Sequence, residues 1–217
     1  GPTSFIDVDN NPWLRSVRFS EDIGDVNFFG LGSVRVANNA DLEEISALPG
    51  GDSGAGVGSI YLGNVVVSGN DKLKTLDLSL STQGTIDVPE DVVISQNSQG
   101  LVSGLDTVVF AGDRSFAIGG KLEVSENNFA DEFVFNLSKL SSVGEELRLA
   151  CNNGVFKEDR SCEAMSPQGS TLGFVFSELT TVAGGFSVEQ NASISSLDFQ
   201  ALESTGDFSL RANRFED

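Results

Sequence analysis

Eight asparagines in the chain are preceded by the same apolar pattern, and this repeat limits the possible folds more than any other feature of the sequence. Each follows two apolar residues placed five and three positions earlier; before Asn191 these are Phe186 and Val188. The spacing from one such asparagine to the next is irregular, at 28, 31, 27, 30, 25, 39 and 22 residues. The pattern predicts an internal repeat of eight units. The asparagines that share this register are Asn11, Asn39, Asn70, Asn97, Asn127, Asn152, Asn191 and Asn213.

Each unit predicts one short strand, and some units predict a second. Two apolar residues two positions apart indicate a strand with one buried face, so the residue between them faces outward. In four units a second apolar cluster follows the asparagine, as in "LKTLDL" and "ISSLDF". Asn, Gly, Ser and Asp separate the two clusters and are typical of turns. No segment keeps a 3.6-residue period over a dozen residues, so the sequence predicts an all-β parallel solenoid with one unit per coil.

The shared asparagine has a physical role in such a coil. Where a strand leaves its sheet at a corner, backbone donors and acceptors in the interior lose their partners. Stacked asparagine amides can bond to these groups from coil to coil, and a leucine could not. The eight asparagines are therefore expected to form a structural ladder and not a catalytic set.

Several units also resemble a known family. The segments "NNPWLRSVRF", "NNADLEEISAL", "GNDKLKTLDL" and "VAGGFSVEQNASISSLDFQALESTG" resemble the receptor L-domain type of leucine-rich solenoid, found in growth-factor receptor ectodomains and fungal GPI-anchored cell-wall glycoproteins. The resemblance spans about residues 5–217. It implies a right-handed parallel β-helix-like domain of about eight coils, outside a cell, used for binding or wall organisation. A leucine-rich-repeat horseshoe is the alternative fold, although it would favour apolar residues two positions after the asparagine, where Asp41 and Ser193 stand here.

Charge and the missing histidine restrict the possible functions. The chain carries 32 acidic and 13 basic residues, a formal net charge of -19, which disfavours nucleic acid and anionic membrane surfaces as partners. It has no histidine, the commonest general base and transition-metal ligand. No catalytic residue, cofactor or metal ligand is therefore predicted. Calcium stays possible because Asp and Asn crowd the turns, but no spaced Asp-x-Asp-x-Asp-Gly loop supports it.

The two ends carry expectations of their own. Gly1 and Pro2 resemble the remnant of a cleaved purification tag, so residues 3–217 are taken as a single domain. Trp13 is expected to cover the first coil. The last unit, "DFSLRANRFED", stops soon after its strand, and an open solenoid end exposes apolar side chains and strand edges. The chain is therefore expected to be a piece of a longer extracellular protein.

Cysteines and sequons favour the outside of a cell. Cys151 and Cys162 bracket a polar segment inside an inserted loop, about residues 151–170, and are predicted to form a disulfide in an oxidising compartment. Two unpaired thiols in a cytosolic protein are the alternative. Of the two N-x-S sequons, at Asn136 and Asn191, the second belongs to the ladder, so Asn136 is the predicted glycosylation site.

A partner-binding face is predicted from the outward position of the strands. The residue between the two apolar positions of each unit forms a column, and equivalent residues in neighbouring coils stack about 4.8 Å apart. Two valines at its centre with charged neighbours suggest a binding strip, although valine also simply favours strands and a surface ion pair contributes little. The predicted strip consists of Arg35, Val66, Val93, Glu123 and Arg148.

These features predict a non-catalytic recognition or adhesion module, secreted or at the cell surface, with a protein or glycan partner. The alternative is a carbohydrate-active β-helix enzyme, a polysaccharide lyase or hydrolase. Such an enzyme would use convergent carboxylates, for which Asp91 and Glu123 are the candidates. Lys121 and Arg148 beside them more simply neutralise their charge.

Overall fold

Every regular element that the structure describes is a β-strand. The computed structural model describes residues 5–19, 29–47, 60–78, 86–99, 104–110, 114–157, 161–164, 171–192, 194–211 and 213. Among their strand pairings only that of β15 with β16 is antiparallel, and the others are parallel. The prediction of an all-β chain with mainly parallel sheets is therefore confirmed. The supposed tag residues Gly1 and Pro2 lie outside the described ranges.

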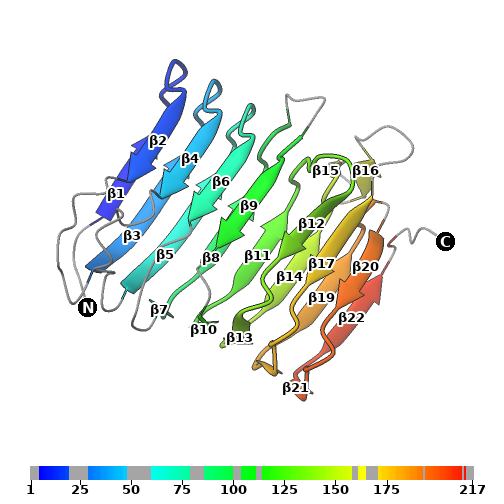
Figure 1. Ribbon diagram of the computed structural model, residues 1–217. Helices are drawn as coiled ribbons and strands as arrows, with labels where there is room; N and C mark the ends of the chain where they lie inside the picture. Colours follow the sequence, from blue (N-terminus) through cyan, green and yellow to red (C-terminus); the bar gives the residue numbers. More distant parts are fainter. Residues whose placement is uncertain are drawn as a thin grey trace.

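The largest sheet has thirteen strands and forks at β5 (Ile60–Ser68). The start of β5 pairs with β7, and its end pairs with β8. We call the strands that continue through β8 the front arm (Figure 1): β1 (Phe5–Asp9), β3 (Phe29–Ala37), β5, β8 (Val92–Ser95), β11 (Leu122–Ser125), β14 (Leu147–Ala150), β19 (Phe186–Glu189) and β22 (Phe208–Arg211). The other arm consists of β7 (Ile86–Val88), β10 (Phe116–Ile118), β13 (Leu140–Val143), β18 (Thr181–Val182) and β21 (Ser204–Thr205).

Two smaller parallel sheets hold the second strands of the units. One contains β2 (Ser16–Phe19), β4 (Glu44–Ala47), β6 (Thr75–Leu78) and β9 (Thr107–Phe110), and the other contains β12 (Phe133–Asn136), β17 (Leu172–Val175) and β20 (Ile194–Asp198). An antiparallel hairpin of β15 (Gly154–Phe156) and β16 (Cys162–Ala164) completes the set. Figure 1 shows successive strands of the sheets side by side from the blue N-terminal to the red C-terminal part. The sequence predicted β2, β4, β6 and β20, but it missed β9, β12 and β17 and the whole second arm.

The apolar pairs of the front arm point into one hydrophobic core. Val65, Val67, Val92 and Ile94 are each 1% exposed, and inward residues of the second strands, such as Phe135, belong to the same cluster. Burial of one such side chain contributes about 1.5–3 kcal/mol. The alternation inferred from the sequence thus corresponds to the buried and outward faces of these strands.

The eight asparagines of the repeat form one hydrogen-bonded column along the end of the front arm. Asn97 is typical: its backbone N–H and its Nδ2 donate to Oδ1 of Asn127, at 3.2 and 3.0 Å, and Nδ2 also donates to the carbonyl oxygen of Val67 at 2.9 Å. The backbone N–H of each asparagine donates to Oδ1 of the next, from Asn11 to Asn213. The column therefore satisfies interior backbone groups at every corner and ties each unit to the next.

The residue before each of the first seven ladder asparagines has a left-handed backbone conformation. Its φ lies between 51° and 63°, a region that residues other than Gly and Asn rarely adopt. This conformation turns the chain out of the front arm at each corner, and the ladder beneath it stabilises the turn. These corner residues are Asn10, Asn38, Gly69, Gln96, Glu126, Cys151 and Gln190.

The expectation for Trp13 is wrong. Its side chain is 86% exposed and does not cover the first unit. The residue lies in a turn two positions after the ladder asparagine, and the residues at that position in the next two units are the polar Asp41 and Lys72. The apolar residues of the first unit that do pack on the core are Val8, Leu14 and Val17. Position within the turn, and not side-chain size, decides which residue is buried here.

Replacing one ladder asparagine should destabilise the fold. In Asn97→Leu the Val67 carbonyl and the Asn70 donors lose their partners in the interior, which should lower the free energy of unfolding by about 2–4 kcal/mol. For a chain of this size the melting temperature should fall by roughly 5–15 °C.

Thermal unfolding followed by circular dichroism measures this effect. The exposed Asn136, changed to Leu, is the matched control and should alter stability by less than about 0.5 kcal/mol. An Asn97→Leu protein as stable as the wild type would show that the column is not needed for folding.

Candidate partner-binding surface

The five residues of the predicted strip lie on five consecutive strands of the front arm. Arg35 pairs in register with Val66, Val66 with Val93, Val93 with Glu123, and Glu123 with Arg148. All five are partly exposed, and the core residues on either side of each are buried. The structure therefore brings the five predicted residues together as one outward-facing row.

Val66 and Val93 form the apolar centre of this strip. They are direct register partners, and the neighbouring outward position carries Ser68 and Ser95, which are also partners. Small side chains beside the valines leave their outer surface accessible. This part of the strip presents a flat, apolar patch with hydroxyl groups along one side.

Arg35 ends the strip on the N-terminal side within a small charge network. Its Nη1 lies 2.9 Å from Oδ1 of Asp7 and 3.1 Å from Oδ2 of Asp9. The hydrogen bond from Arg35 is the largest cause that lowers the pKa of Asp9, and a bond from Asn38 adds to it. The guanidinium group is thus oriented by two carboxylates and keeps its charge.

Glu123 carries the strongest set of contacts in the strip. Its carboxylate is 2.8 Å from Nη1 of Arg148 and 3.4 Å from Nζ of Lys121, and it accepts a hydrogen bond from Oγ of Ser125 at 2.9 Å. Burial raises the pKa of Glu123, but the Ser125 bond and the charges of Arg148 and Lys121 outweigh it, so the pKa is lowered overall. The side chain of Glu123 is only 20% exposed, so its ion pair with Arg148 is less solvated than the surface pair expected from the sequence.

Asp91 and Glu123, the carboxylates considered for catalysis, both have protein partners. Oδ1 of Asp91 accepts the backbone N–H of Lys121 at 2.9 Å. A glycosidic general acid needs a carboxyl group that keeps its proton near neutral pH, and the lowered pKa of Glu123 has the opposite effect. The arrangement is suited to holding neighbouring strands together.

The disulfide bond joins Cys151 to Cys162 at the start of the insertion. Their Cα atoms are 5.6 Å apart. Strand β15 lies between the two cysteines in sequence and pairs with β16, which begins at Cys162. A Cβ at Gly154 would approach Sγ of Cys162 to 2.4 Å, so only glycine allows the disulfide to cross the hairpin here. A closed loop of this length contributes roughly 3 kcal/mol in the chain-entropy estimate.

The two sequon asparagines differ in accessibility. Asn136 ends β12 and is exposed, and its Oδ1 accepts the backbone N–H of Ser138 at 2.9 Å. Asn191 is 1% exposed, and its Nδ2 donates to the Leu149 carbonyl at 2.9 Å within the ladder. Ser193 of the second sequon lies outside the described residues.

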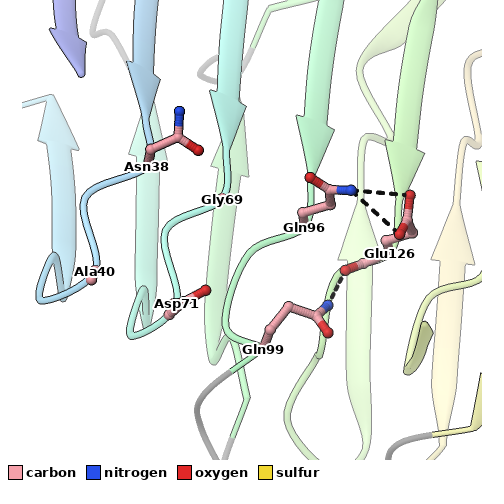
Figure 2. Close-up of a pocket in the computed structure, with 7 residues that line it drawn as sticks. All are labelled: Asn38, Ala40, Gly69, Asp71, Gln96, Gln99 and Glu126. Carbon is pink, nitrogen blue, oxygen red and sulfur yellow. Dashed lines mark hydrogen bonds between the residues drawn. The ribbon is translucent and has the colours of Figure 1, made fainter. Parts of the chain in front are cut away.

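A groove that sequence reasoning missed lies at the corner beyond the front arm. It has a volume of about 420 Å³ and follows the ends of β3, β5, β8 and β11 (Figure 2). We call it the corner groove. The signal that could have located it is the position before each ladder asparagine, which supplies four of its seven residues. The groove is lined by Asn38, Ala40, Gly69, Asp71, Gln96, Gln99 and Glu126.

The described residues contain neither a cluster of metal-ligating side chains nor a membrane-spanning helix. Among the described residues no three Asp, Glu or Cys side chains gather closely enough to hold a metal ion. A calcium site therefore has no cluster of carboxylates to support it in these ranges. The described ranges also contain no helix of the length and apolar character needed to cross a bilayer.

Comparison of the chain with protein-family models, with curated proteins and with solved structures finds no match. The resemblance to receptor L-domains therefore rests on the repeat units quoted above.

Glycosylation should occur at Asn136 and not at Asn191. Expression in a glycosylating eukaryotic host, followed by mass spectrometry of proteolytic peptides, should find glycan mass on the Asn136 peptide only, because the Asn191 amide is buried and bonded. Asn136→Gln should remove the glycan completely. Glycan on Asn191 would show that its side chain leaves the ladder.

The lowered pKa of Glu123 predicts how its contribution to stability depends on pH. A depressed carboxyl pKa stabilises the fold above the pKa of the unfolded chain, about 4.3, and this contribution is lost as the pH falls through the folded-state pKa. Wild type should therefore be more stable than Glu123→Gln at pH 7, and the difference should shrink as the pH is lowered from about 5 to about 3. Urea unfolding at a series of pH values measures this difference in the free energy of unfolding. A difference that grows as the pH falls would contradict the contacts assigned to Glu123.

Proposed function

We propose that the chain is a right-handed parallel β-solenoid of the receptor L-domain type, with about eight coils. The parallel pairing of equivalent strands in successive units supports this fold, because each unit contributes one strand to the front arm. The hydrogen-bonded asparagine column supports it further, because its seven steps join all eight units in order. A leucine-rich-repeat horseshoe shares the apolar pair and the asparagine, but the second strands favour the solenoid.

The proposed role is non-catalytic recognition or adhesion at a cell surface or in the secreted space. The disulfide supports an oxidising compartment, and the exposed sequon at Asn136 agrees with it. The net charge of -19 favours partners that are neutral or basic. A protein or glycan of the cell surface or wall is the expected partner class.

The front strip is the proposed contact surface, and its uninterrupted register is the observation that carries this proposal. Five partly exposed residues stand on five neighbouring strands, with Val66 and Val93 between charged residues. Such a flat row has an apolar centre and a polar rim, the composition of many protein interfaces. Each charged side chain of the strip is oriented by a partner, which reduces the entropy lost on binding.

The enzyme alternative has weaker support. A polysaccharide lyase or hydrolase on this face would depend on Glu123, whose carboxylate is bonded to Ser125, Arg148 and Lys121. These contacts favour a permanently ionised group that holds strands together, so a role in proton transfer has no geometric support at this position.

Binding to arrays of cell-surface glycans and extracellular protein domains tests the proposal. The double variant Val66→Asp/Val93→Asp should weaken each interaction at least about tenfold, because charges replace the apolar centre, while the melting temperature stays within a few degrees. Ser187→Asp/Ser209→Asp introduces the same charges further along the same row and is the matched control.

Two results would contradict this function. Equal binding by the valine and serine double variants would exclude the strip as the contact surface. Release of reducing ends or unsaturated products from a polysaccharide panel, abolished by Glu123→Gln, would show that the protein is an enzyme.

A further inference from the structure

We propose that the corner groove binds a basic, arginine- or lysine-containing segment of an extracellular protein. This inference rests on the proposed recognition function, but it names a different surface and a definite ligand chemistry. The groove lies past the ends of the strands that carry the strip, so one partner chain could contact both.

Two small residues line the groove. Gly69 leaves a hollow between Asn38 on one side and Gln96 on the other, and Ala40 lies at the edge of the groove beyond Asn38 (Figure 2). Gly69 has a φ of +63°, and a Cβ there would approach Oδ1 of Asn38 to 2.7 Å. The six other described corner residues adopt a similar φ with larger side chains, so the hollow at this corner follows from the glycine at position 69.

The amide donors that line the groove already have partners within the protein. Nδ2 of Asn38 donates to Oδ1 of Asp9 at 2.9 Å. Nε2 of Gln96 lies 3.4 and 3.5 Å from the two carboxylate oxygens of Glu126, and Nε2 of Gln99 donates to the backbone carbonyl of Glu126. These contacts direct the nitrogen of each of the three side-chain amides toward an acceptor of the protein.

The groove consequently presents oxygen acceptors to a ligand. Within the described part of the chain, Oδ1 of Asn38, Oε1 of Gln96 and Oε1 of Gln99 accept no hydrogen bond, and the Asp71 carboxylate has no partner. Two carboxylates and no Lys or Arg stand among the lining residues. The surface is therefore negatively charged and rich in acceptors.

Guanidinium and ammonium groups match this surface better than sugars do. Arginine and lysine side chains carry donors and no acceptors, whereas each sugar hydroxyl also brings acceptor lone pairs that would face oxygens here. The groove contains no aromatic residue on which a sugar ring could stack. Arginine has the closer fit, because its planar fork can bond a carboxylate and an amide oxygen together.

The spacing of the two carboxylates favours an extended ligand over a single ion. Glu126 belongs to a unit two strands beyond that of Asp71, which corresponds to a separation of about 10 Å at a strand spacing of about 4.8 Å. One calcium ion, with oxygens at 2.3–2.6 Å, could not contact both. The four corner residues of the groove span about 14 Å, a length that a few residues of extended peptide would fill.

A blocked hexa-arginine peptide carrying a fluorophore is the probe for this proposal, with anisotropy measured at about 0.15 M salt, where surface charges are screened beyond about 8 Å. The groove variant Asp71→Asn/Glu126→Gln should weaken binding about fivefold, the effect of losing two exposed ion pairs. The control variant Asp87→Asn/Glu132→Gln removes the same charge from exposed residues elsewhere and should change binding less than about twofold.

A second variant tests the shape of the groove independently of its charge. Ala40→Trp fills the hollow from an exposed turn position and should also weaken peptide binding about fivefold or more, with the folded state verified by circular dichroism. The strip variant Val66→Asp/Val93→Asp should bind the peptide at least as tightly as the wild type. This variant therefore distinguishes a failure of the proposed strip function from a failure of the groove proposal.

Three results would overturn the proposal. Equal weakening by the groove and control variants would mean that the peptide responds to net charge alone. Unchanged binding by Ala40→Trp would place the peptide elsewhere. Groove-dependent binding of chitosan oligomers or of calcium chloride, with no groove-dependent binding of the peptide, would assign the groove to a glycan or to a metal ion.

Discussion

The fold depends on the way in which asparagine amides satisfy the backbone where each strand of the front arm ends. A chain that turns a corner inside a hydrophobic core leaves carbonyl and N–H groups without partners, and each such group costs about 1–3 kcal/mol. In the six ladder asparagines from Asn39 to Asn191, Nδ2 reaches back to a carbonyl of the preceding unit and Oδ1 accepts from the preceding asparagine. One residue type at one register position thereby solves the same problem at every corner.

The two surfaces with proposed functions follow from this column. Because the ladder holds neighbouring units in a fixed register, the outward residues of the front arm form straight rows, and Val66 and Val93 become neighbours although they are distant in sequence. The corner residues directly before the ladder are aligned in the same way, and the glycine among them, Gly69, opens the hollow of the groove. The proposed recognition would use these aligned rows of side chains.

Much of this arrangement could be predicted from the sequence, because the repeat marks every ladder asparagine and the apolar pair before it. The second strands β2, β4 and β6 were predictable since each begins five residues after its asparagine. Strand β9 begins ten residues after Asn97, and β17 follows a long insertion, so a fixed register could not find them. The strands β7, β10, β13, β18 and β21 of the second arm are only two to four residues long, too short to show a clear periodicity. The groove was missed because glutamine and glutamate, the residue types at positions 96 and 126, seldom adopt a left-handed conformation. The burial of Trp13 was predicted wrongly because its position in the turn faces solvent.

Hydrogen exchange of individual asparagines tests the central role of the ladder most directly. Two-dimensional NMR of the protein after transfer to deuterated water would resolve backbone and side-chain amide protons of each asparagine. The account predicts that Asn70, Asn97, Asn127 and Asn152 exchange only through global unfolding, at rates that give the full free energy of unfolding, while Asn136 exchanges at once. Exchange of the ladder asparagines as fast as that of Asn136 would contradict the claim that their amides hold the units together.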